Sequence, residues 1–487
     1  MSASSPHVDP AAGPAGIELR RVLGLGDIIL MNVVAVVGLR WITRGARVDA
    51  PAVTLWVLAW AMFFVPLAAA VSELSSRYPE QGGIYAWSRR AFGPVHGFIC
   101  GWCLWVNNLF YFPSALLFAA ANAAAIFGPP GVAMAETRWF SMVFVLGVLW
   151  LLVILNIRGY GAGRWLQNLG GISTWIPAAL LVAAGGVSLW LYGSATSFAP
   201  SKLLPREDVL TTLSLWSAMC FAFSGFEIGS FSGQEVKNPR RTIPRGVMIA
   251  GLITTLIYIV GTVSVLIAVP SSAVAERSGV TEVVDLVSSR IGLIGLGVLT
   301  GALIAIGQIA GVSAWASGAA RVSFAAGLDR VMPESMARLH PKHQTPHVAL
   351  IVQAIISSLI LLVSLFFTIA GGQTTIQEAY DILVNLTIII YFIPYLYLFP
   401  ALVRLRRIDP VREGDEAQTM LIPGGRIGLW LIAGAGSLAT LISLALVFVP
   451  PAGTSSTLNY EANLILQSLI VIGAGGVLYW IAQRRRA

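Results

Sequence analysis

Residues 35–42 read AVVGLRWI and place Arg40 inside the first strongly apolar run of the chain. From Ile28 to Leu39 this run is almost wholly apolar, yet it provides only about 18 Å of helix at 1.5 Å per residue. The hydrocarbon core of a bilayer is roughly 30 Å thick, so an uninterrupted helix would bring Arg40 into the bilayer. Two interpretations follow. Either Arg40 extends along its aliphatic stem to the outer interface, or Gly38 marks a helix break and Arg40 faces a polar cavity.

The composition of the whole chain indicates that its main solvent is lipid. Of 487 residues, 56% are hydrophobic and only 11% are charged, whereas soluble domains carry roughly 25% charged residues. The mean hydropathy is +0.78. The sequence therefore predicts an all-α integral membrane protein with about twelve transmembrane helices. The predicted spans are residues 24–46, 51–76, 94–127, 137–156, 165–192, 209–233, 245–269, 292–325, 347–369, 379–402, 426–449 and 462–482.

Basic residues divide unevenly between the two sides that these spans define. With sides alternating from span to span, 23 of the 31 Lys and Arg residues fall on one side and eight on the other. Loops rich in Lys and Arg stay in the cytoplasm, so we expect a protein of the cell membrane with both termini cytoplasmic. We interpret residues 1–18 as a disordered cytoplasmic tail. The net charge of +8 follows from this asymmetry and gives no reason to expect nucleic-acid binding.

A second apolar run is interrupted in the same way as the first. Residues 215–229 read LWSAMCFAFSGFEIG. Superposing Gly225 on Gly38 places Glu227 on Arg40, because each charge lies two residues beyond its glycine. Paired interrupted spans at matching places in two halves are typical of transporters built from inverted repeats. The predicted divisions are a first repeat of five spans in 19–200, a second in 201–410, and two further spans with a basic cytoplasmic C-terminus in 411–487.

A break of this kind creates a polar site in the middle of a bilayer. Unwound residues free N–H and C=O groups, which must line a cavity because lipid cannot pair with them. The start of the second half-helix suits a carboxylate, and the freed carbonyls suit an ammonium group. A zwitterionic amino acid matches both ends of such a site, whereas a sugar has no evident need of it.

Several motifs resemble those of the amino acid–polyamine–organocation permeases. The resemblance extends over roughly residues 20–405. It implies a LeuT-like core of 5+5 inverted repeats with helices 1 and 6 broken, and two peripheral helices. The motifs that carry it are ELSSRYPEQGGIY at 73–85, FAFSGFE at 221–227, EVKNPRRTIP at 235–244, RVSFAAGLDRVMP at 321–333 and Thr345-Pro346.

The resemblance also implies where a substrate binds. The family places the substrate carboxylate at a Gly-Ser-Gly stretch in helix 1; this chain reads GLRWI at residues 38–42, which favours a contribution from the arginine. By the same resemblance, carbonyls near Val36, Phe221 and Ser224 meet the substrate amine, and Phe221 covers the substrate. Asn108 matches a pocket-facing position, although hydrogen bonding between helices explains it equally well. The expected substrate-binding residues are Val36, Val37, Gly38, Leu39, Arg40, Asn108, Phe221, Phe223, Ser224 and Gly225.

Four residues are expected to couple and gate the movement of substrate. We expect Arg40 and Glu227 to form an ion pair across the pocket. A substrate anion that competes for Arg40 would release Glu227, which could then bind a proton. Glu73, near the inner end of span 2, is expected to pair with a loop arginine and latch the inner gate. Tyr391 in span 10 is interpreted as a pocket or gate residue.

A sodium site is a less favoured alternative to proton coupling or exchange. Thr174 aligns with a position at which some members of the family carry a lysine that replaces a cation. Ser313 and Ser317 share one face of span 8 through their i, i+4 spacing and would help to ligate Na⁺. Packing of small residues between helices explains both serines equally well. No cofactor and no metal site are expected.

We therefore expect a secondary amino acid transporter that works by alternating access. Its expected partners are a small amino acid, H⁺ and the lipid bilayer. An enzyme is not expected, because the sequence offers no nucleophile–base pair, metal set or phosphate loop in a suitable context. Two alternatives remain: an antiporter for acidic amino acids and their decarboxylation products, to which Arg40 alone points, and a sensor that binds amino acids without transporting them.

Overall fold

Regular structure in the described part of the chain is helical. The only exception there is one isolated β-bridge between Leu23 and Val236. The computed structural model describes residues 23–79, 82–158, 160–205, 209–231, 236–328, 334–343, 345–366, 375–410, 419–450 and 457–484.

The helices follow one another without any sheet to connect them. A π-helical segment, η1 (Trp60–Phe64), joins α3 to α4. The first half contains α1 (Leu25–Val36), α2 (Arg40–Ala46), α3 (Ala52–Ala59), α4 (Val65–Arg77), α5 (Ile84–Phe92), α6 (Pro94–Ala125), α7 (Pro129–Ala135), α8 (Arg138–Arg158) and α9 (Tyr160–Tyr192). The second half contains α10 (Val209–Ala222), α11 (Ile228–Phe231), α12 (Pro239–Ala268), α13 (Gly279–Arg290), α14 (Leu296–Leu328), α15 (His347–Phe366), α16 (Ile376–Ile408), α17 (Gly425–Leu446) and α18 (Thr457–Arg484).

The apolar spans predicted from sequence coincide with these helices. Among the described residues, ten helical stretches are long and apolar enough to cross a bilayer. The pair α1 and α2, bent by 50° at the break between them, makes an eleventh. The place of the remaining predicted span holds α10, whose apolar stretch Thr212–Ala222 is shorter. The prediction of an all-α membrane protein is confirmed.

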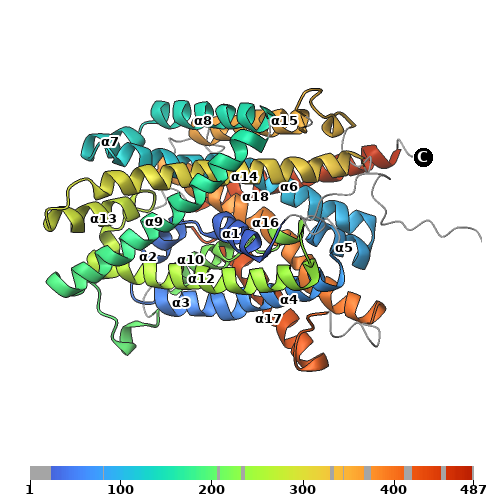
Figure 1. The fold of residues 1–487 in the computed structure, drawn as a ribbon, viewed down its shortest axis with the longest axis horizontal. Helices are drawn as coiled ribbons and strands as arrows, with labels where there is room; N and C mark the ends of the chain where they lie inside the picture. The colour runs from blue at the N-terminus through green and yellow to red at the C-terminus, as the bar shows by residue number, and fades with distance from the viewer. Residues whose placement is uncertain are drawn as a thin grey trace, which may run out of the picture.

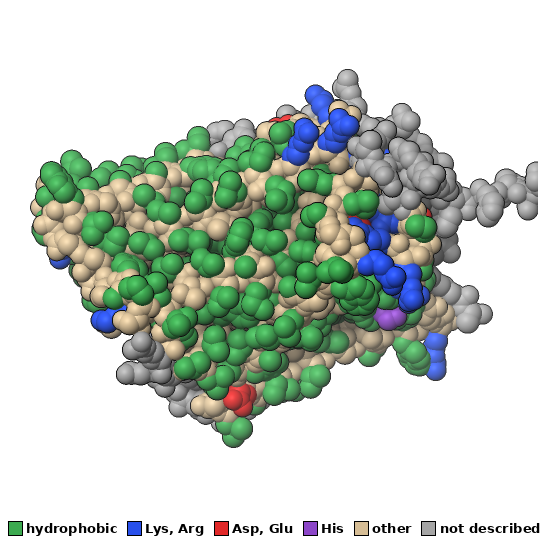
Figure 2. All heavy atoms as spheres, turned by 90° about the horizontal axis from the view of Figure 1, so that it is seen from below, with side chains coloured by type: hydrophobic (Ala, Val, Ile, Leu, Met, Phe, Trp, Pro, Cys, Tyr) green, Lys and Arg blue, Asp and Glu red, His purple; other side chains and the backbone are tan. Residues whose placement is uncertain are grey.

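The outer surface has the character that lipid contact requires. Large hydrophobic side chains such as Leu431 of α17 and Leu469 of α18 are exposed, and Figure 2 shows hydrophobic side chains across the middle of one face. Lys and Arg side chains gather at the right-hand end of that view. In Figure 1 the same end holds α5, and the other end holds α7 and α13. We call these the basic end and the opposite end.

Two long helices, α6 and α16, form the interior of the bundle. In their most apolar stretches 94% of α6 and 83% of α16 is buried, against 28% for α8 and 17% for α18. Helix α14 packs on both α6 and α9, and α6 also packs on α16. Helices α8 and α15 pack together and lie at the top of Figure 1. Polar residues on α6, α14 and α16 are therefore shielded from lipid.

The first helix break falls where the sequence predicts it. Helix α1 ends at Val36, Val37 is extended (φ −67°, ψ 102°), and α2 begins at Arg40. A Cβ atom on Gly38 would lie 2.8 Å from Nε1 of Trp41. The absence of a side chain at Gly38 thus allows the Trp41 indole to fold over the break.

The second helix break lies against the first. Helix α10 ends at Ala222 and α11 begins at Ile228. Between them, Gly225 has a φ of +102°, a conformation that residues with a Cβ rarely adopt. A Cβ atom on Gly225 would lie 3.3 Å from Cγ2 of Val36, so the two breaks are in contact. The predicted pair of broken helices is confirmed, whereas the repeat boundaries stay a prediction.

A widened helical turn, which the sequence did not reveal, supports the second break. The π-helical segment η1 contains Phe64, whose ring lies 5.4 Å from the ring of Phe223 and 5.0 Å from that of Phe226, between centroids. Pro66, which follows η1, has no N–H to donate to the preceding turn. A Cβ atom on Gly251 of α12 would lie 1.8 Å from Cζ of Phe64, so only a glycine leaves space for this ring.

Candidate functional site

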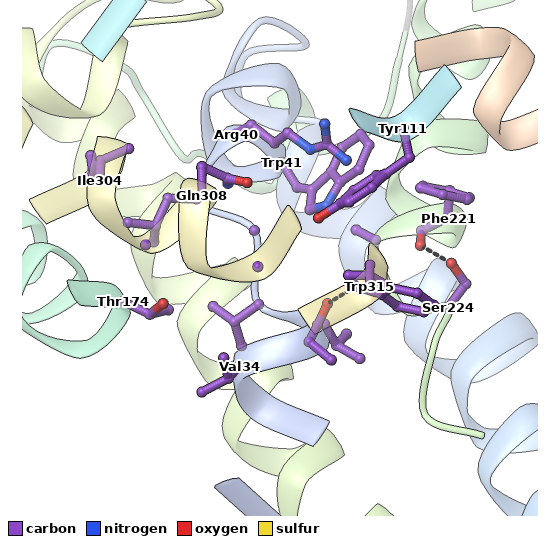
Figure 3. A pocket seen from close by; sticks show the side chains of 18 of the residues that line it. Val34, Arg40, Trp41, Tyr111, Thr174, Phe221, Ser224, Ile304, Gln308 and Trp315 are labelled. Carbon is purple, nitrogen blue, oxygen red and sulfur yellow. Dashed lines mark hydrogen bonds between the residues drawn. The ribbon is translucent and has the colours of Figure 1, made fainter. Parts of the chain in front are cut away.

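A cavity of about 60 Å³ lies where the two helix breaks meet. It is lined by the end of α1, the start of α2, and parts of α6, α9, α10, α14 and α16. A cavity needs at least roughly 10–15 Å³ to hold one water, so this cavity is large enough to admit solvent or a ligand group. Figure 3 shows Ile304, Gln308 and Thr174 on one side of the cavity, Phe221, Ser224 and Trp315 on the other, and Arg40, Trp41 and Tyr111 above.

Most of the substrate-binding residues expected from the sequence line this cavity. Phe223 does not line it; its buried ring packs on Trp56, with 5.7 Å between centroids. Gly225 is also outside the lining and lies next to the Val36 side chain. The expected substrate-binding residues that do line the cavity are Val36, Val37, Gly38, Leu39, Arg40, Phe221 and Ser224. Thr174, expected at a cation site, and Tyr391, expected at a gate, line it as well.

Of two neighbouring asparagines on α6, Asn107 lines the cavity and the expected Asn108 does not. The Asn108 side chain is buried, and its Nδ2 donates to the carbonyl of Leu104 one turn earlier at 2.8 Å. Successive residues of a helix differ by about 100° in direction, and here Asn107 faces the cavity while Asn108 does not. In the part of the chain that the structure describes, Asn108 therefore neither lines the cavity nor forms the hydrogen bond between helices that was the alternative interpretation, because its bond lies within α6.

Arg40 is a buried cation without a counter-ion. Only 3% of the residue is exposed. Its guanidinium carbon lies 4.3 Å from the ring centroid of Trp41 and 5.2 Å from that of Tyr111. In the described part of the chain no carboxylate pairs with Arg40, and its Nη1 has no hydrogen-bond partner. The electron-rich faces of the two rings stabilise the cation in part, and Nη1 of this cavity-lining residue keeps an unused hydrogen-bond donor.

The expected ion pair between Arg40 and Glu227 is not formed. Glu227 is fully buried, and its carboxylate accepts hydrogen bonds from Tyr391 at 2.6 Å and from Tyr395 at 3.0–3.1 Å. Tyr391 also lines the cavity, so this phenol stands between the cavity and the carboxylate. Two hydroxyl groups of α16 thus satisfy Glu227 in place of the guanidinium, and this part of the sequence prediction is wrong.

A single hydroxyl group joins the two breaks. Tyr258 of α12 is fully buried, and its hydroxyl group lies 2.8 Å from the carbonyl of Val36 and 3.1 Å from that of Ala222. The same hydroxyl accepts a hydrogen bond from the N–H of Gly38 at 3.2 Å. It therefore serves three main-chain groups that the breaks leave without helical partners. Sequence reasoning missed Tyr258, although a tyrosine inside an apolar span signals a hydroxyl that must find a partner.

Two further side chains form hydrogen bonds with the main chain at the breaks. Tyr395 of α16 accepts a hydrogen bond from the N–H of Gly225 at 3.0 Å. Trp315 of α14 donates from Nε1 to the carbonyl of Ala35 at 3.3 Å. The carbonyl of Phe221 accepts from the main-chain N–H of Ser224 at 2.9 Å. Much of the main chain expected to meet a ligand is thus already engaged by the protein.

A buried charged cluster lies toward the opposite end. Arg44, one turn beyond Arg40 on α2, pairs with Glu276 at 2.8 Å and with Asp381 of α16 at 3.1 Å. Arg47 is a second partner of Glu276, which lies in the connection between α12 and α13. Burial would raise the pKa of the Glu276 carboxyl, but Arg44 and Arg47 outweigh burial and hold this pKa below its ordinary value. The cluster ties α2 to α16 on the far side of the cavity.

A second charged cluster lies at the basic end. Glu73 of α4 accepts a hydrogen bond from Nε of Arg406 at 2.8 Å and from the main-chain N–H of Ile422 at 3.0 Å. The predicted arginine partner of Glu73 is confirmed, but Arg406 belongs to the last turns of α16 and not to a loop. Nearby, Tyr78 donates to Asp409 at 2.8 Å. The pairings join the ends of α4 and α16 to the segment that leads into α17.

Two of the three residues expected to form a cation site, Thr174 and Ser313, have side chains that the structure describes. Thr174 lines the cavity, and its hydroxyl donates to the carbonyl of Gly170 at 2.9 Å. The Ser313 hydroxyl is outside the lining and accepts from Asn156 at 3.0 Å. Ser317 lies outside the residues whose side chains the structure describes. A cation site at these residues stays a prediction.

The sequence as a whole matches a known family. A family model described as amino acid permease matches residues 23–474, which is nearly the whole chain. The match includes both helix breaks, the cavity between them and both charged clusters.

Three relatives match almost from end to end. An uncharacterised transporter of Legionella pneumophila is 27% identical over 433 residues, which are 89% of this chain and 90% of that protein. A protein named as a probable agmatine/putrescine antiporter of Lactococcus lactis is 22% identical over 87% of each chain. A glutamate/gamma-aminobutyrate antiporter of the same organism is 22% identical over 86% of this chain and 82% of its own. The two antiporters are named for different solutes, so likeness alone does not select a substrate.

Proposed function

The chain belongs to the amino acid permease family, and on that premise we propose that it is a secondary transporter that binds an amino acid in the cavity between its two helix breaks. The cavity lies between a charged cluster at the basic end and another toward the opposite end. Transporters with broken helices bind their substrates at such breaks and expose them to one side at a time. The arrangement therefore favours alternating access.

One observation carries this proposal: Arg40 is buried beside the cavity with an open donor. An unpaired buried charge is costly, and a ligand carboxylate that pairs with it removes that cost. Guanidinium groups bind carboxylates through two parallel hydrogen bonds. The carboxylate of an amino acid is the ligand group that this position suits best.

The ammonium group of the substrate would face the C-terminal end of α1. Residues 34–37 line the cavity there, and the C-terminal end of a helix carries partial negative charge. Each carbonyl oxygen has two lone pairs. The hydrogen bond from Tyr258 therefore leaves the Val36 carbonyl able to accept a second one. The substrate would thus lie across the first break, with its carboxylate toward α2.

We propose that the two charged clusters close the two entrances to the cavity. Lys and Arg concentrate on the cytoplasmic side of membrane proteins, so the basic end faces the cytoplasm, together with both termini. Separation of Glu73 from Arg406 would open the cytoplasmic entrance. Separation of Arg44 from Glu276 and Asp381 would open the external one. Both clusters are paired here, which supports an occluded arrangement.

Proton coupling through Glu227 is proposed, with obligatory exchange as the alternative. Tyr391 is the link, because its ring lines the cavity and its hydroxyl donates to Glu227. A substrate that moves Tyr391 would remove a donor from the buried carboxylate and so favour its protonation. Glu227→Gln is then expected to abolish the pH dependence of uptake while substrate is still bound.

The proposal is tested by uptake of labelled amino acids into proteoliposomes. We expect Arg40→Ala to reduce uptake to background and Arg40→Lys to restore part of it, because a lysine keeps the charge but not the two parallel hydrogen bonds. Arg290→Ala serves as the matched control, since Arg290 is exposed at the end of α13. Normal uptake by Arg40→Ala would remove the basis of the proposed site.

A second candidate function is exchange of acidic amino acids for their decarboxylation products. The cation at Arg40 favours it, and one relative is named a glutamate/gamma-aminobutyrate antiporter. Counterflow distinguishes this function, because an exchanger takes up labelled substrate only when the vesicles are loaded. Binding without uptake in loaded or unloaded vesicles would indicate a sensor.

A further inference from the structure

The cavity has a second polar side that the sequence did not predict. Asn107 of α6, Ser173 of α9 and Gln308 of α14 all line it. Asn107 is 4% exposed and Ser173 is fully buried. The Asn107 Oδ1 and Ser173 Oγ atoms find no hydrogen-bond partner among the described residues. Three helices thus present neutral polar groups to the same small volume.

Unpartnered polar atoms at this depth point to a ligand. Buried polar groups in folded proteins are nearly always paired, and leaving one unpaired lowers stability. Helix α6 carries two neighbouring asparagines whose Oδ1 atoms are unpartnered, but only Asn107 lines the cavity, and Asn108 donates from Nδ2 to its own helix. A solute with a hydrogen-bonding group would satisfy Asn107 and Ser173 together.

The formal charge of the cavity limits which solute this is. Among the described residues that line the cavity, Arg40 is the only one with a formal charge. A diamine would meet this cation and no carboxylate. A second substrate carboxylate would find no second cation. One carboxylate and an otherwise uncharged body fit this lining, with the ammonium group at the partial negative charge of the α1 C-terminus.

We infer that the substrate is a small amino acid whose side chain ends in an uncharged hydroxyl or amide group, and that Asn107, Ser173 and Gln308 recognise that group. This inference rests on the proposed function, because it assumes that Arg40 binds the substrate carboxylate. The apolar Ile304, which lies beside Gln308 in the lining, limits how far a longer side chain extends.

Three pairs of ligands test the inference on the unmodified protein, and the members of the first two pairs are isosteric. Titration calorimetry of the purified full chain in detergent compares threonine with valine, asparagine with aspartate, and alanine with putrescine. We expect threonine and asparagine each to bind at least about tenfold more tightly than its partner, because a site built for a hydrogen bond rejects the analogue that lacks it. Putrescine is expected not to bind. Valine equal to threonine, or aspartate equal to asparagine, would overturn the inference.

Variants separate this inference from the proposed function. Asn107→Leu and Gln308→Met should abolish the preference for threonine over alanine. The matched control is Asn108→Leu, which should keep the preference. If alanine binds in a way that requires Arg40 but threonine binds no more tightly than valine, the substrate class is wrong and the proposed function stands. If no amino acid binds, or binding does not require Arg40, both fail.

Discussion

The two helix breaks share a layout but differ in what surrounds their charged residues. Each has a glycine followed two residues later by a charge, Gly38 with Arg40 and Gly225 with Glu227. Arg40 faces the cavity with an open donor, while Glu227 is held behind Tyr391 by two hydroxyl groups. Residues at equivalent positions in the two halves of the chain therefore need not have the same role. We propose that the first charge meets a ligand, whereas the second already has hydrogen-bond partners within the protein.

The largest effect is expected from neutralising the two charges in turn. Arg40→Ala should weaken amino acid binding by about 100-fold or more, because a buried charge pair is lost. Its melting temperature without ligand should not fall, since an unpaired buried charge is removed. Glu227→Gln should keep binding within about threefold and lower the melting temperature instead. Calorimetry and thermal unfolding of both variants check these expectations. Equal losses of amino acid affinity in the two variants would contradict the proposed difference between Arg40 and Glu227.

The next effect concerns Arg44, which lies on the same helix as Arg40 but is paired. Glu276→Gln should destabilise the protein by about 3 kcal/mol at neutral pH, because Arg44 keeps only Asp381. The folded pKa of Glu276 is lowered, so its stabilising contribution is present above the unfolded pKa and is lost as pH falls through the folded one. Melting temperatures of wild type and variant should therefore converge on acidification below the ordinary carboxyl range. A difference that stays constant would contradict the pairing.

A smaller effect is expected when Glu227 loses one of its donors. Tyr395→Phe removes the hydroxyl that serves both Glu227 and the N–H of Gly225, and should cost about 2 kcal/mol of unfolding free energy. The matched control is Tyr380→Phe, a buried tyrosine of the same helix that donates no hydrogen bond to either break. Denaturation of the two variants side by side gives the comparison. Equal stability of both would mean that Glu227 does not depend on this hydroxyl.

The smallest effect is expected at the residue that joins the breaks. Tyr258→Phe leaves the Gly38 N–H without its acceptor and the Val36 and Ala222 carbonyls without their donor. We expect the free energy of unfolding to fall by about 1 kcal/mol. Transport should change in maximal rate more than in apparent affinity, because no hydrogen bond to the substrate is removed. A change in affinity alone would assign Tyr258 to the binding site.

Much of the fold could be predicted because the relevant signals are local in sequence. A run of apolar residues reports a span wherever it lies, and a glycine followed by a charge within such a run reports an interruption. Both breaks, at Gly38 and Gly225, were found in this way. The arginine partner of Glu73 was also within reach, because basic residues gather at the ends of spans.

The partners of the two charges could not be predicted, because they depend on contacts far apart in sequence. Glu227 bonds to tyrosines more than 160 residues away, and no spacing rule connects them. Asn107 and Asn108 differ in sequence by one position but point in different directions, and only the packing of α6 decides which faces the cavity. The partners of the Tyr258 hydroxyl could not be predicted either, because they are main-chain groups of both breaks.

The most direct test of the central claim is an experimental structure of the protein with a bound amino acid. The account predicts the substrate carboxylate at hydrogen-bond distance, about 2.7–3.2 Å, from the guanidinium of Arg40, with Glu227 still bonded to tyrosine. A carboxylate bound elsewhere, or an ion pair between Arg40 and Glu227 in the presence of substrate, would contradict it.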